Sequence, residues 1–380
     1  MSGPVPVKCV VWDIDNTLLT GVFLEAGDQP PAADPELAAV LAELGGRGIL
    51  HALASKNPPA AAEHTAAVTG WQFAAAECGW GRKSDALTKI AATLGLGVDT
   101  LAFVDDDPVE RAEVASALPQ VRVLTPAEAT EAAGWPEFSP PVVTAEARRR
   151  GQLYAERRQR QAARQSFGGT RDEFLRSVGT DVSIAPASRS DLPRLAELAA
   201  RTRQFNSAAG QRQAPPGVVP PDWFAGLLAD RATDVLTVRL QDSFGDDGLV
   251  GACVIDRGDP AAWTVRLLMI SCRAMGRGVA EALLAWLTRR AASQGAQALR
   301  VPCTIDERNL PLRLALAGAG FRAASQAPAG PATGPVPAGA PASPAAAVFA
   351  RELAGPLPGL ASWVHPDPEA PLPNARPEPA

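Results

Sequence analysis

The stretch VVWDIDNTLL, residues 10–19, decides the fold of the N-terminal half of the chain. It is an apolar run that ends in two aspartates, Asp13 and Asp15, spaced two residues apart. On a strand, side chains i and i+2 share a face, so both carboxylates are expected to project the same way from the strand end. Two like charges at the edge of a hydrophobic core need a counterion.

Short apolar strands and helical stretches alternate around this motif, from about residue 7 to 130. We predict strands at 7–12, 49–54, 101–104 and 121–124, and helices at 35–47, 58–68, 83–94 and 108–117. This alternation indicates an α/β fold with a Rossmann-like parallel sheet, whose sites lie at the carboxyl ends of its strands. Asp13 and Asp15 fall at such an end.

Further polar residues follow the other predicted strands. Ser55 ends the second strand, Lys83 opens a helix, and Asp105 and Asp106 follow the strand LAFV. Carboxylates that converge on one crevice repel by several kcal/mol unless a hard divalent cation such as Mg²⁺ lies among them. With a hydroxyl and an ammonium to hold phosphate, this set suits phosphoryl transfer, in which a carboxylate attacks phosphorus and its neighbour handles the proton.

Two other acidic residues near this set are open to another interpretation. Asp107 and Glu110 could belong to the same site, or they could simply cap or solvate the helix that follows.

Composition limits the class of protein. A length of 380 residues favours two domains, and 46% hydrophobic with 20% charged residues is typical of a globular chain. A net charge of -5 gives no reason to expect nucleic acid or a membrane as a partner. The N-terminus lacks a secretory pattern and no apolar run could span a bilayer, so we expect a cytoplasmic location. Five irregularly spaced cysteines form neither a disulfide framework nor a zinc signature.

The chain divides into segments of different composition. We predict a first domain at 1–143, a connecting helical segment rich in Arg and Gln at 144–180, and an α+β domain at 181–363 with an Ala/Pro/Gly-rich insertion at 323–347, followed by a proline-rich tail at 364–380. The connecting segment could be a solvated helix or a patch for an anion or a partner. In the second domain, β-like runs at 235–242, 249–258 and 261–271 precede a helix at 279–292, a strand at 298–303 and a helix from about 310.

The second domain contains the sequence SCRAMGRG, residues 271–278, between a strand and a helix. A glycine-bearing turn at a helix N-terminus presents free backbone N–H groups to a phosphate, although it could also be a plain turn. Cys272 stands directly before this turn, where the helix dipole and two arginines, Arg273 and Arg277, would lower the pKa of its thiol and favour a thiolate, but it could equally be a buried strand-end residue. Cys78 is the second candidate thiol, because it lies in a loop that could cover the first site.

The motifs DIDNT, LAS, Lys83 and FVDDDP, in this order, resemble those of the haloacid dehalogenase (HAD) superfamily of aspartate-dependent phosphotransferases. The resemblance implies a nucleophile, a general acid/base, phosphate ligands and Mg²⁺ ligands. Asp13 would be the nucleophile and Asp15 the general acid/base. Phosphate would be bound by Thr17, Ser55 and Lys83. Mg²⁺ would be bound by Asp13, Asp15, Asp105 and Asp106.

The pattern R-x-x-G-x-G at residues 273–278 resembles the coenzyme A loop of the GCN5-related acyltransferase (GNAT) fold. The resemblance implies that Arg273, Gly276, Arg277 and Gly278 bind a phosphopantetheine. The aromatic residue that serves many acetyltransferases as an acid has no counterpart in LRLALAGAGF, residues 312–321, which argues against ordinary N-acetyl transfer.

Taken together, residues 8–322 resemble the FkbH-like HAD-type glyceryltransferases of polyketide biosynthesis. The resemblance rests on CVVWDIDNTL, LASKN, LGLGVDTLAFVDDDPVER, RRRGQLYAERRQRQ, DEFLRSV, RTRQFN and SCRAMGRGVAEALL. It implies an enzyme that dephosphorylates D-1,3-bisphosphoglycerate, an acyl phosphate, and delivers the glyceryl unit through a cysteine to an acyl carrier protein. Two alternatives stay open: a phosphatase of small phosphate esters whose second domain is a scaffold, and a non-catalytic module that docks a carrier protein.

Overall fold

The computed structural model describes residues 5–27, 29, 31–140, 143–202, 204–207, 221–305, 309–324 and 346–366. The chain forms two compact units, Met1–Ala163 and Arg164–Ala380. Most of the predicted insertion at 323–347 and of the predicted tail at 364–380 lies outside the described residues. The described part contains no helix that is both long and apolar enough to cross a membrane.

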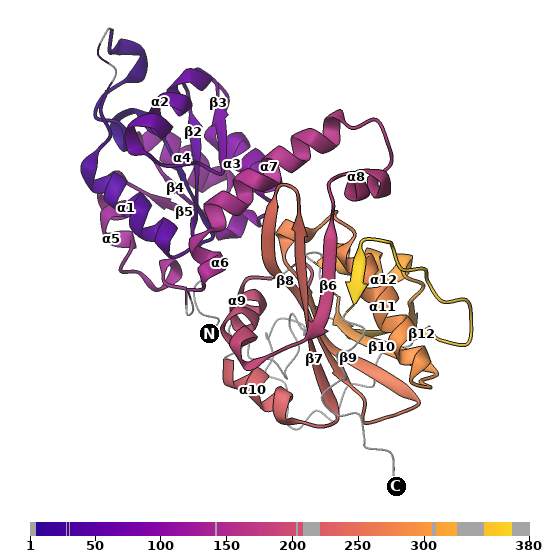
Figure 1. The fold of residues 1–380 in the computed structure, drawn as a ribbon. Coiled ribbons are helices and arrows are strands. Elements are labelled where there is room, and N and C mark those ends of the chain that lie inside the picture. Colours follow the sequence, from indigo (N-terminus) through magenta and orange to yellow (C-terminus); the bar gives the residue numbers. More distant parts are fainter. Residues whose placement is uncertain are drawn as a thin grey trace. The chain divides into compact units, whose positions relative to one another are not determined.

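The first unit is built on a five-stranded parallel sheet (Figure 1). Its strands, in spatial order, are β3 (Ala75–Cys78), β2 (Leu50–Ser55), β1 (Cys9–Trp12), β4 (Leu101–Val104) and β5 (Arg122–Leu124). This confirms the predicted α/β class. Strand β3 was not predicted, because its residues AAEC have weak strand propensity. The strand nevertheless forms beside β2, in a register that pairs Ala52 with Ala75.

Strand β1 is buried on both faces, as its unbroken apolar sequence requires. Val10 and Trp12 pack into one core cluster, and Cys9 and Val11 into another on the opposite face. The first cluster is covered by α1 (Pro35–Gly46), α2 (Pro59–Thr69) and α5 (Pro126–Ala132). The second is covered by α3 (Lys83–Leu94) and α4 (Pro108–Ala117). The sheet therefore lies between two layers of helices, and loops follow the carboxyl ends of its strands.

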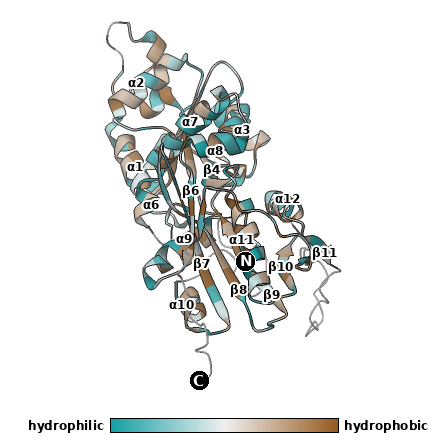
Figure 2. Cartoon of the chain, turned by 45° about the vertical axis from the view of Figure 1, so that its right-hand side comes forward, coloured by the Kyte–Doolittle hydropathy of each residue, from teal (hydrophilic) through white to brown (hydrophobic). Residues whose placement is uncertain are grey.

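Three helices occupy the predicted connecting segment: α6 (Ala145–Arg148), α7 (Arg150–Ser166) and α8 (Arg171–Ser177). The long helix α7 is strongly hydrophilic, as Figure 2 shows. Its first half nevertheless packs on the first unit, because Leu153 and Tyr154 are buried and Arg157 Nη1 donates a hydrogen bond to the carbonyl of Leu94 at 2.9 Å. The division between the two units falls inside this helix.

The second unit contains a mixed sheet of eight strands. They are β6 (Asp181–Pro186), β7 (Thr233–Asp242), β8 (Gly245–Asp256), β9 (Ala262–Ile270), β10 (Ala298–Thr304), β11 (Arg322–Ala324), β12 (Ala346–Glu352) and β13 (Val364–Pro366). Their spatial order is β11-β12-β10-β9-β8-β7-β6-β13, with parallel pairing only at β9·β10 and β6·β13. Helices α9 (Leu192–Arg201) and α10 (Pro221–Ala229) contribute to one core cluster, and α11 (Val279–Ser293) and α12 (Leu310–Gly318) to the other. The predicted second α+β fold is thus confirmed.

Short turns complete the two units. They are a wide turn at Ile14–Leu18 and 3₁₀ segments at Phe23–Glu25, Val98–Thr100, Pro136–Phe138, Arg189–Asp191 and Cys272–Ala274.

A histidine lies in the core of the first unit. Trp12 Nε1 donates a hydrogen bond to His51 Nδ1 at 3.0 Å, and the ring of Trp71 meets the His51 ring edge-on with centroids 5.3 Å apart. Burial lowers the pKa of His51 to about 3. The folded protein therefore holds this imidazole neutral at pH values where an unfolded chain would protonate it.

This difference predicts a pH-dependent contribution to stability. The unfolded histidine binds a proton below about pH 6.5 while the folded one does not, so its contribution is complete above that pH and is lost as the pH falls from about 6.5 towards 3. Between pH 7 and pH 5, wild type should lose about 2 kcal/mol more of unfolding free energy than His51→Gln, which keeps an acceptor for Trp12. Urea unfolding followed by circular dichroism measures both. Parallel pH dependences in the two proteins would show that His51 is not buried neutral.

Candidate functional site: strand ends of the first unit and a glycine turn of the second

The turn after β1 sets the orientation of the DIDNT residues. Its closing hydrogen bond runs from the N–H of Leu19 to the carbonyl of Ile14 at 2.9 Å. Asn16 adopts a left-handed conformation with φ 48°, which asparagine tolerates better than most residues. The turn places Asp13 and Thr17 in buried positions at the carboxyl end of the strand, and Asp15 in a half-buried one.

Lys83 joins the strand ends. Its buried ammonium lies 2.5 Å from Asp13 Oδ1 and 3.0 Å from Asp105 Oδ2, and it donates a third hydrogen bond to the carbonyl of Ala54 at 2.7 Å. The contacts come from the ends of β1, β4 and β2, and the lysine is the first residue of α3. The structure thus brings together three of the predicted site residues, Asp13, Lys83 and Asp105.

Asp13, Asp105 and Asp106 form the candidate metal centre. Each offers a carboxylate oxygen, and these oxygens lie within 4.8 Å of one another. Asp13 and Asp105 are buried and Asp106 is exposed, so the cluster has a side open to solvent. Three hard oxygen donors of this kind fit Mg²⁺. Asp15, which was also predicted as a metal ligand, is not part of the cluster.

The electrostatics of this cluster follow from burial. Desolvation raises the pKa of Asp13 to about 6, and the neighbouring charge of Asp105 adds to the rise while Lys83 opposes it. Desolvation also raises the pKa of Asp105, again against the effect of Lys83. Desolvation would lower the pKa of Lys83, but the two carboxylates outweigh it and the pKa is raised. One ammonium therefore compensates three carboxylates only in part, and a divalent cation would complete the balance.

Asp15 belongs to a different set of contacts beside the cluster. Its Oδ1 accepts a hydrogen bond from the N–H of Phe23, and its Oδ2 accepts one from Asn57 Nδ2, both at 2.9 Å. Asn57 Nδ2 also donates to Ser55 Oγ at 3.0 Å. The Thr17 hydroxyl is buried and, among the described residues, has no hydrogen-bond partner. A phosphate oxygen would give that hydroxyl an acceptor.

Asp107 and Glu110 have structural contacts. Asp107 caps α4, because its Oδ1 accepts from the N–H of Val109 at 2.8 Å. Glu110 forms an ion pair with Lys56.

Glu113, which the sequence analysis missed, lies one turn further along α4 and holds the start of α3. Its carboxylate accepts hydrogen bonds from the N–H of Ser84 at 3.0 Å and from its hydroxyl at 2.5 Å, and pairs with Arg82 at 2.9 Å. Burial by itself would raise the pKa of Glu113, but these hydrogen bonds outweigh it and the pKa is lowered. The signal in the sequence was an acidic residue three positions after Glu110 on the same predicted helix.

In the second unit, the SCRAMGRG sequence forms the predicted turn at the N-terminus of α11. Gly276 and Gly278 both have left-handed backbones, with φ 78° and 75°. A Cβ at Gly278 would lie 2.5 Å from the ring of Trp363, so that position requires glycine for space as well as for conformation. Gly276 is exposed, and the first N–H groups of α11 follow it.

The two arginines of this turn are already paired. Arg277 forms ion pairs with Asp242, at 2.6 Å, and with Asp247, and Arg273 Nη1 lies 3.8 Å from Asp247 Oδ1. All four side chains are almost completely buried. The guanidinium groups therefore tie the turn to the β7–β8 hairpin, and a bound phosphate would meet backbone N–H groups first.

Strand β9 has a second neighbour beside the turn. β10 pairs with β9 only from Ala262 to Thr264, although β9 continues to Ile270. Further along the same edge, residues 205–207 take over: the N–H of Ile270 donates to the carbonyl of Phe205 at 3.0 Å, and the N–H of Leu268 donates to Ser207 Oγ at 2.9 Å. An extended ligand along this edge would compete with the chain's own segment.

The five cysteines differ in accessibility. Cys9, Cys253 and Cys303 are buried, and desolvation raises the pKa of each thiol, to about 11 for Cys303. Cys78 is half-buried, and desolvation raises the pKa of its thiol too, with charge effects from Glu77, Lys83 and Asp13. Cys272 is also half-buried and begins the 3₁₀ turn before the glycines. The two predicted candidates are thus the two partly accessible thiols.

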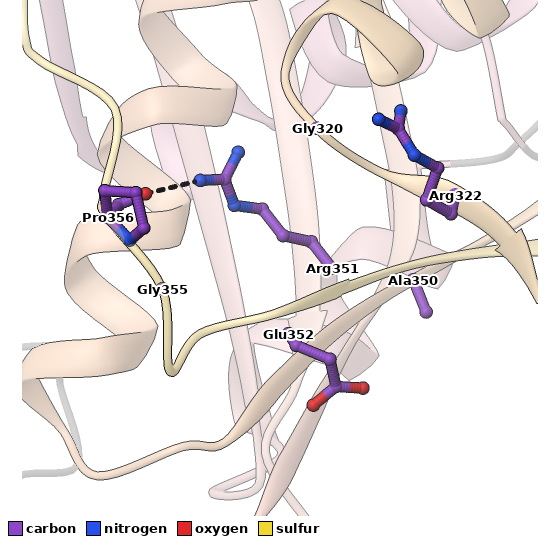
Figure 3. A pocket seen from close by; sticks show the side chains of 7 residues that line it. All are labelled: Gly320, Arg322, Ala350, Arg351, Glu352, Gly355 and Pro356. Carbon is purple, nitrogen blue, oxygen red and sulfur yellow. Dashed lines mark hydrogen bonds between the residues drawn. The ribbon is translucent and has the colours of Figure 1, made fainter.

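A surface hollow of about 470 Å³ in the second unit contains none of the predicted site residues (Figure 3). Its lining comes from the region of β11 and β12, where Arg351 reaches the carbonyl of Pro356 at 3.0 Å. It is a separate feature of the surface.

No protein-family model matches this sequence, and no curated protein does. Among solved structures, the N-terminal part of the protein BF1531 from Bacteroides fragilis, containing a phosphatase domain complexed with Mg, is 28% identical over 32% of this chain and 36% of that chain, with a TM-score of 0.29. An acetyltransferase from Thermus thermophilus is 19% identical over 46% of this chain and 97% of that chain, with a TM-score of 0.33. A GNAT family acetyltransferase from Elizabethkingia anophelis with acetyl-CoA bound is 11% identical over 46% of this chain and 99% of that chain, with a TM-score of 0.32. The match spans 36% of the BF1531 chain, and 97% and 99% of the two acetyltransferase chains.

Proposed function

We propose that the first unit catalyses Mg²⁺-dependent phosphoryl transfer through Asp13. The observation that carries this proposal is the buried contact of Lys83 with both Asp13 and Asp105. A carboxylate that attacks phosphorus needs a cation beside it that also draws in the phosphate oxygens. Mg²⁺ held by Asp13, Asp105 and Asp106 would neutralise charge on the phosphate.

The residues of the chain then have distinct roles. Asp13 attacks phosphorus and forms an aspartyl phosphate. Lys83, Ser55 and the unpartnered hydroxyl of Thr17 bind phosphate oxygens. Asp15, held beside them by its own hydrogen bonds, gives a proton to the leaving group and takes one from the water that hydrolyses the intermediate.

For the whole chain we propose transfer of a glyceryl unit from D-1,3-bisphosphoglycerate, with dephosphorylation, to the phosphopantetheine thiol of an acyl carrier protein. D-1,3-bisphosphoglycerate carries an acyl phosphate and a phosphate ester. The acyl phosphate is a mixed anhydride, so an enzyme thiolate can attack its carbonyl carbon and release that phosphate, while phosphoryl transfer to Asp13 would remove the ester phosphate. Exchange of the resulting thioester with the carrier thiol is nearly thermoneutral. The accessibility of Cys272 and its place before the turn at Gly276 and Gly278 support this assignment. The glycine turn would bind the phosphate of the carrier's arm through backbone N–H groups.

A second candidate function is a phosphatase of small phosphate esters in which the second unit serves only as a scaffold or docking module. The internal pairing of Arg273 and Arg277, and the occupation of the β9 edge by residues 205–207, favour it. The first feature removes two cations, and the second removes part of a strand edge, that could otherwise bind a phosphopantetheine.

Phosphoryl transfer through Asp13 is tested with acetyl phosphate. Asp13→Asn should lower phosphate release by at least about 1,000-fold, because an amide cannot attack phosphorus, and removal of Mg²⁺ with EDTA should stop wild type. Asp85→Asn makes the same chemical change at an exposed position in the first turn of α3, and should leave the rate within about twofold. Equal rates for wild type and Asp13→Asn would refute the role of Asp13.

Glyceryl transfer is tested by intact-protein mass spectrometry of a phosphopantetheinylated carrier protein. With Mg²⁺ and D-1,3-bisphosphoglycerate generated in place, wild type should add a glyceryl-sized mass to the carrier, and Asp13→Asn should not. Cys272→Ala should abolish loading with its circular dichroism unchanged, while Cys78→Ala should load normally. Normal loading by Cys272→Ala would move the role to Cys78 or to direct attack by the carrier thiol. Phosphate release without any mass gain would favour the phosphatase.

A further inference from the structure

We propose that Asn57 is a positioning residue that holds Asp15 in place for proton transfer. The inference rests on the proposed function of the first unit, in which Asp15 exchanges protons with the leaving group and with water. It concerns a residue that lies outside the set of catalytic, phosphate-binding and metal-binding residues predicted from the sequence.

Asn57 connects the two motifs that meet at the strand ends. It stands two residues after Ser55, at the end of β2, and its side chain is 1% exposed. Nδ2 donates one hydrogen bond to Asp15 Oδ2, at 2.9 Å, and one to Ser55 Oγ, at 3.0 Å. Both amide protons are therefore used, one on the predicted acid/base and one on a predicted phosphate ligand.

The orientation of this amide follows from chemistry. Both carboxylate oxygens of Asp15 accept hydrogen bonds, so the amide nitrogen of Asn57, which is the donor of that side chain, faces Asp15. The opposite atom, Oδ1, is buried and lacks a hydrogen-bond partner within the described residues. A buried carbonyl oxygen without a partner is unfavourable, and this amide bears that penalty while it keeps its donor on Asp15.

The two donors fix the Asp15 carboxylate from both sides. The backbone N–H of Phe23 holds Oδ1 and Asn57 holds Oδ2, so rotation of the carboxylate breaks a hydrogen bond. Phe23 supplies a backbone N–H, which substitutions other than proline leave in place. Asn57 is thus the side chain through which this hold can be tested, and proton transfer is the step that depends on it.

Acetyl phosphate separates the two steps of the reaction. In the first, a carboxylate oxygen of Asp13 attacks phosphorus, the bond from phosphorus to the acetyl oxygen breaks, and acetate leaves with the electron pair without needing a proton. In the second, water attacks phosphorus and gives a proton to Asp15, the bond from phosphorus to Asp13 breaks, and phosphate is released. Asp15 then returns its proton to solvent. Only the second step needs the acid/base.

The test compares Asn57→Leu and Asn57→Asp with wild type in the full chain, in the presence of Mg²⁺. Both variants should lower kcat for acetyl phosphate by about 10- to 100-fold with little change in KM, and both should accumulate phosphoenzyme, detected by intact mass after acid quench. Asn57→Asp preserves the size of the side chain but replaces the hydrogen-bond donor with a carboxylate. If Asn57 only filled space, this variant would keep the wild-type kcat. Thr65→Val, which removes a buried hydrogen bond to Ala61 in the same unit, should match wild type.

Two outcomes would overturn the inference. Wild-type kcat in Asn57→Asp would show that no donor to Asp15 is needed there. Loss of turnover without any phosphoenzyme would show that Asn57 supports the pocket as a whole. If wild type itself neither releases phosphate nor forms phosphoenzyme, the proposed function fails, and this inference falls with it.

Discussion

The first unit depends on one buried ammonium. Lys83 Nζ contacts Asp13, Asp105 and the carbonyl of Ala54, and so connects β1, β4 and β2 to the first residue of α3. Removing one partner from a buried ion pair typically costs about 3–5 kcal/mol, because the remaining charge stays desolvated. The strand ends are therefore held in register by the same charges that would act on phosphate. Glu113 supports the arrangement from α4 by holding Ser84, the second residue of α3.

The same contacts leave the site short of positive charge. Asp13, Asp105 and Asp106 converge within 4.8 Å, and desolvation raises the pKa of both buried members. A fold without a function there would gain stability by replacing one carboxylate with an apolar residue. The buried hydroxyl of Thr17, which has no hydrogen-bond partner within the described part of the chain, is also unfavourable for stability. A metal ion and a phosphate would satisfy both deficits, which is the physical reason to interpret this cluster as a site.

The sequence predicted these positions because parallel strands place their carboxyl ends on one edge. Asp13, Ser55 and Asp105 each follow an apolar strand, and that pattern is sufficient to bring them together. It does not show which partner each side chain takes. The hydrogen bond from Asn57 to Asp15 joins residues 42 positions apart. It depends on the rotamers of both side chains, which no local sequence pattern encodes. The weak strand propensity of β3 hid an edge strand that forms only by pairing with β2.

The second unit shows the limit of a motif more clearly. The turn at 271–278 was predictable from its glycines, because Gly276 and Gly278 both adopt a positive φ and the ring of Trp363 leaves no space for a Cβ at Gly278. The arginines were not, because a guanidinium binds a phosphate or a buried carboxylate equally well, and Asp242 and Asp247 lie on a hairpin about 30 residues earlier. Because the two arginines are neutralised inside the unit, only the backbone N–H groups and the helix dipole of this turn would attract an anion. The helix dipole contributes about 0.3–1 kcal/mol at an exposed terminus. If this turn binds the phosphate of a carrier, it would serve to orient that phosphate, and most of the binding energy would have to come from contacts elsewhere on the chain.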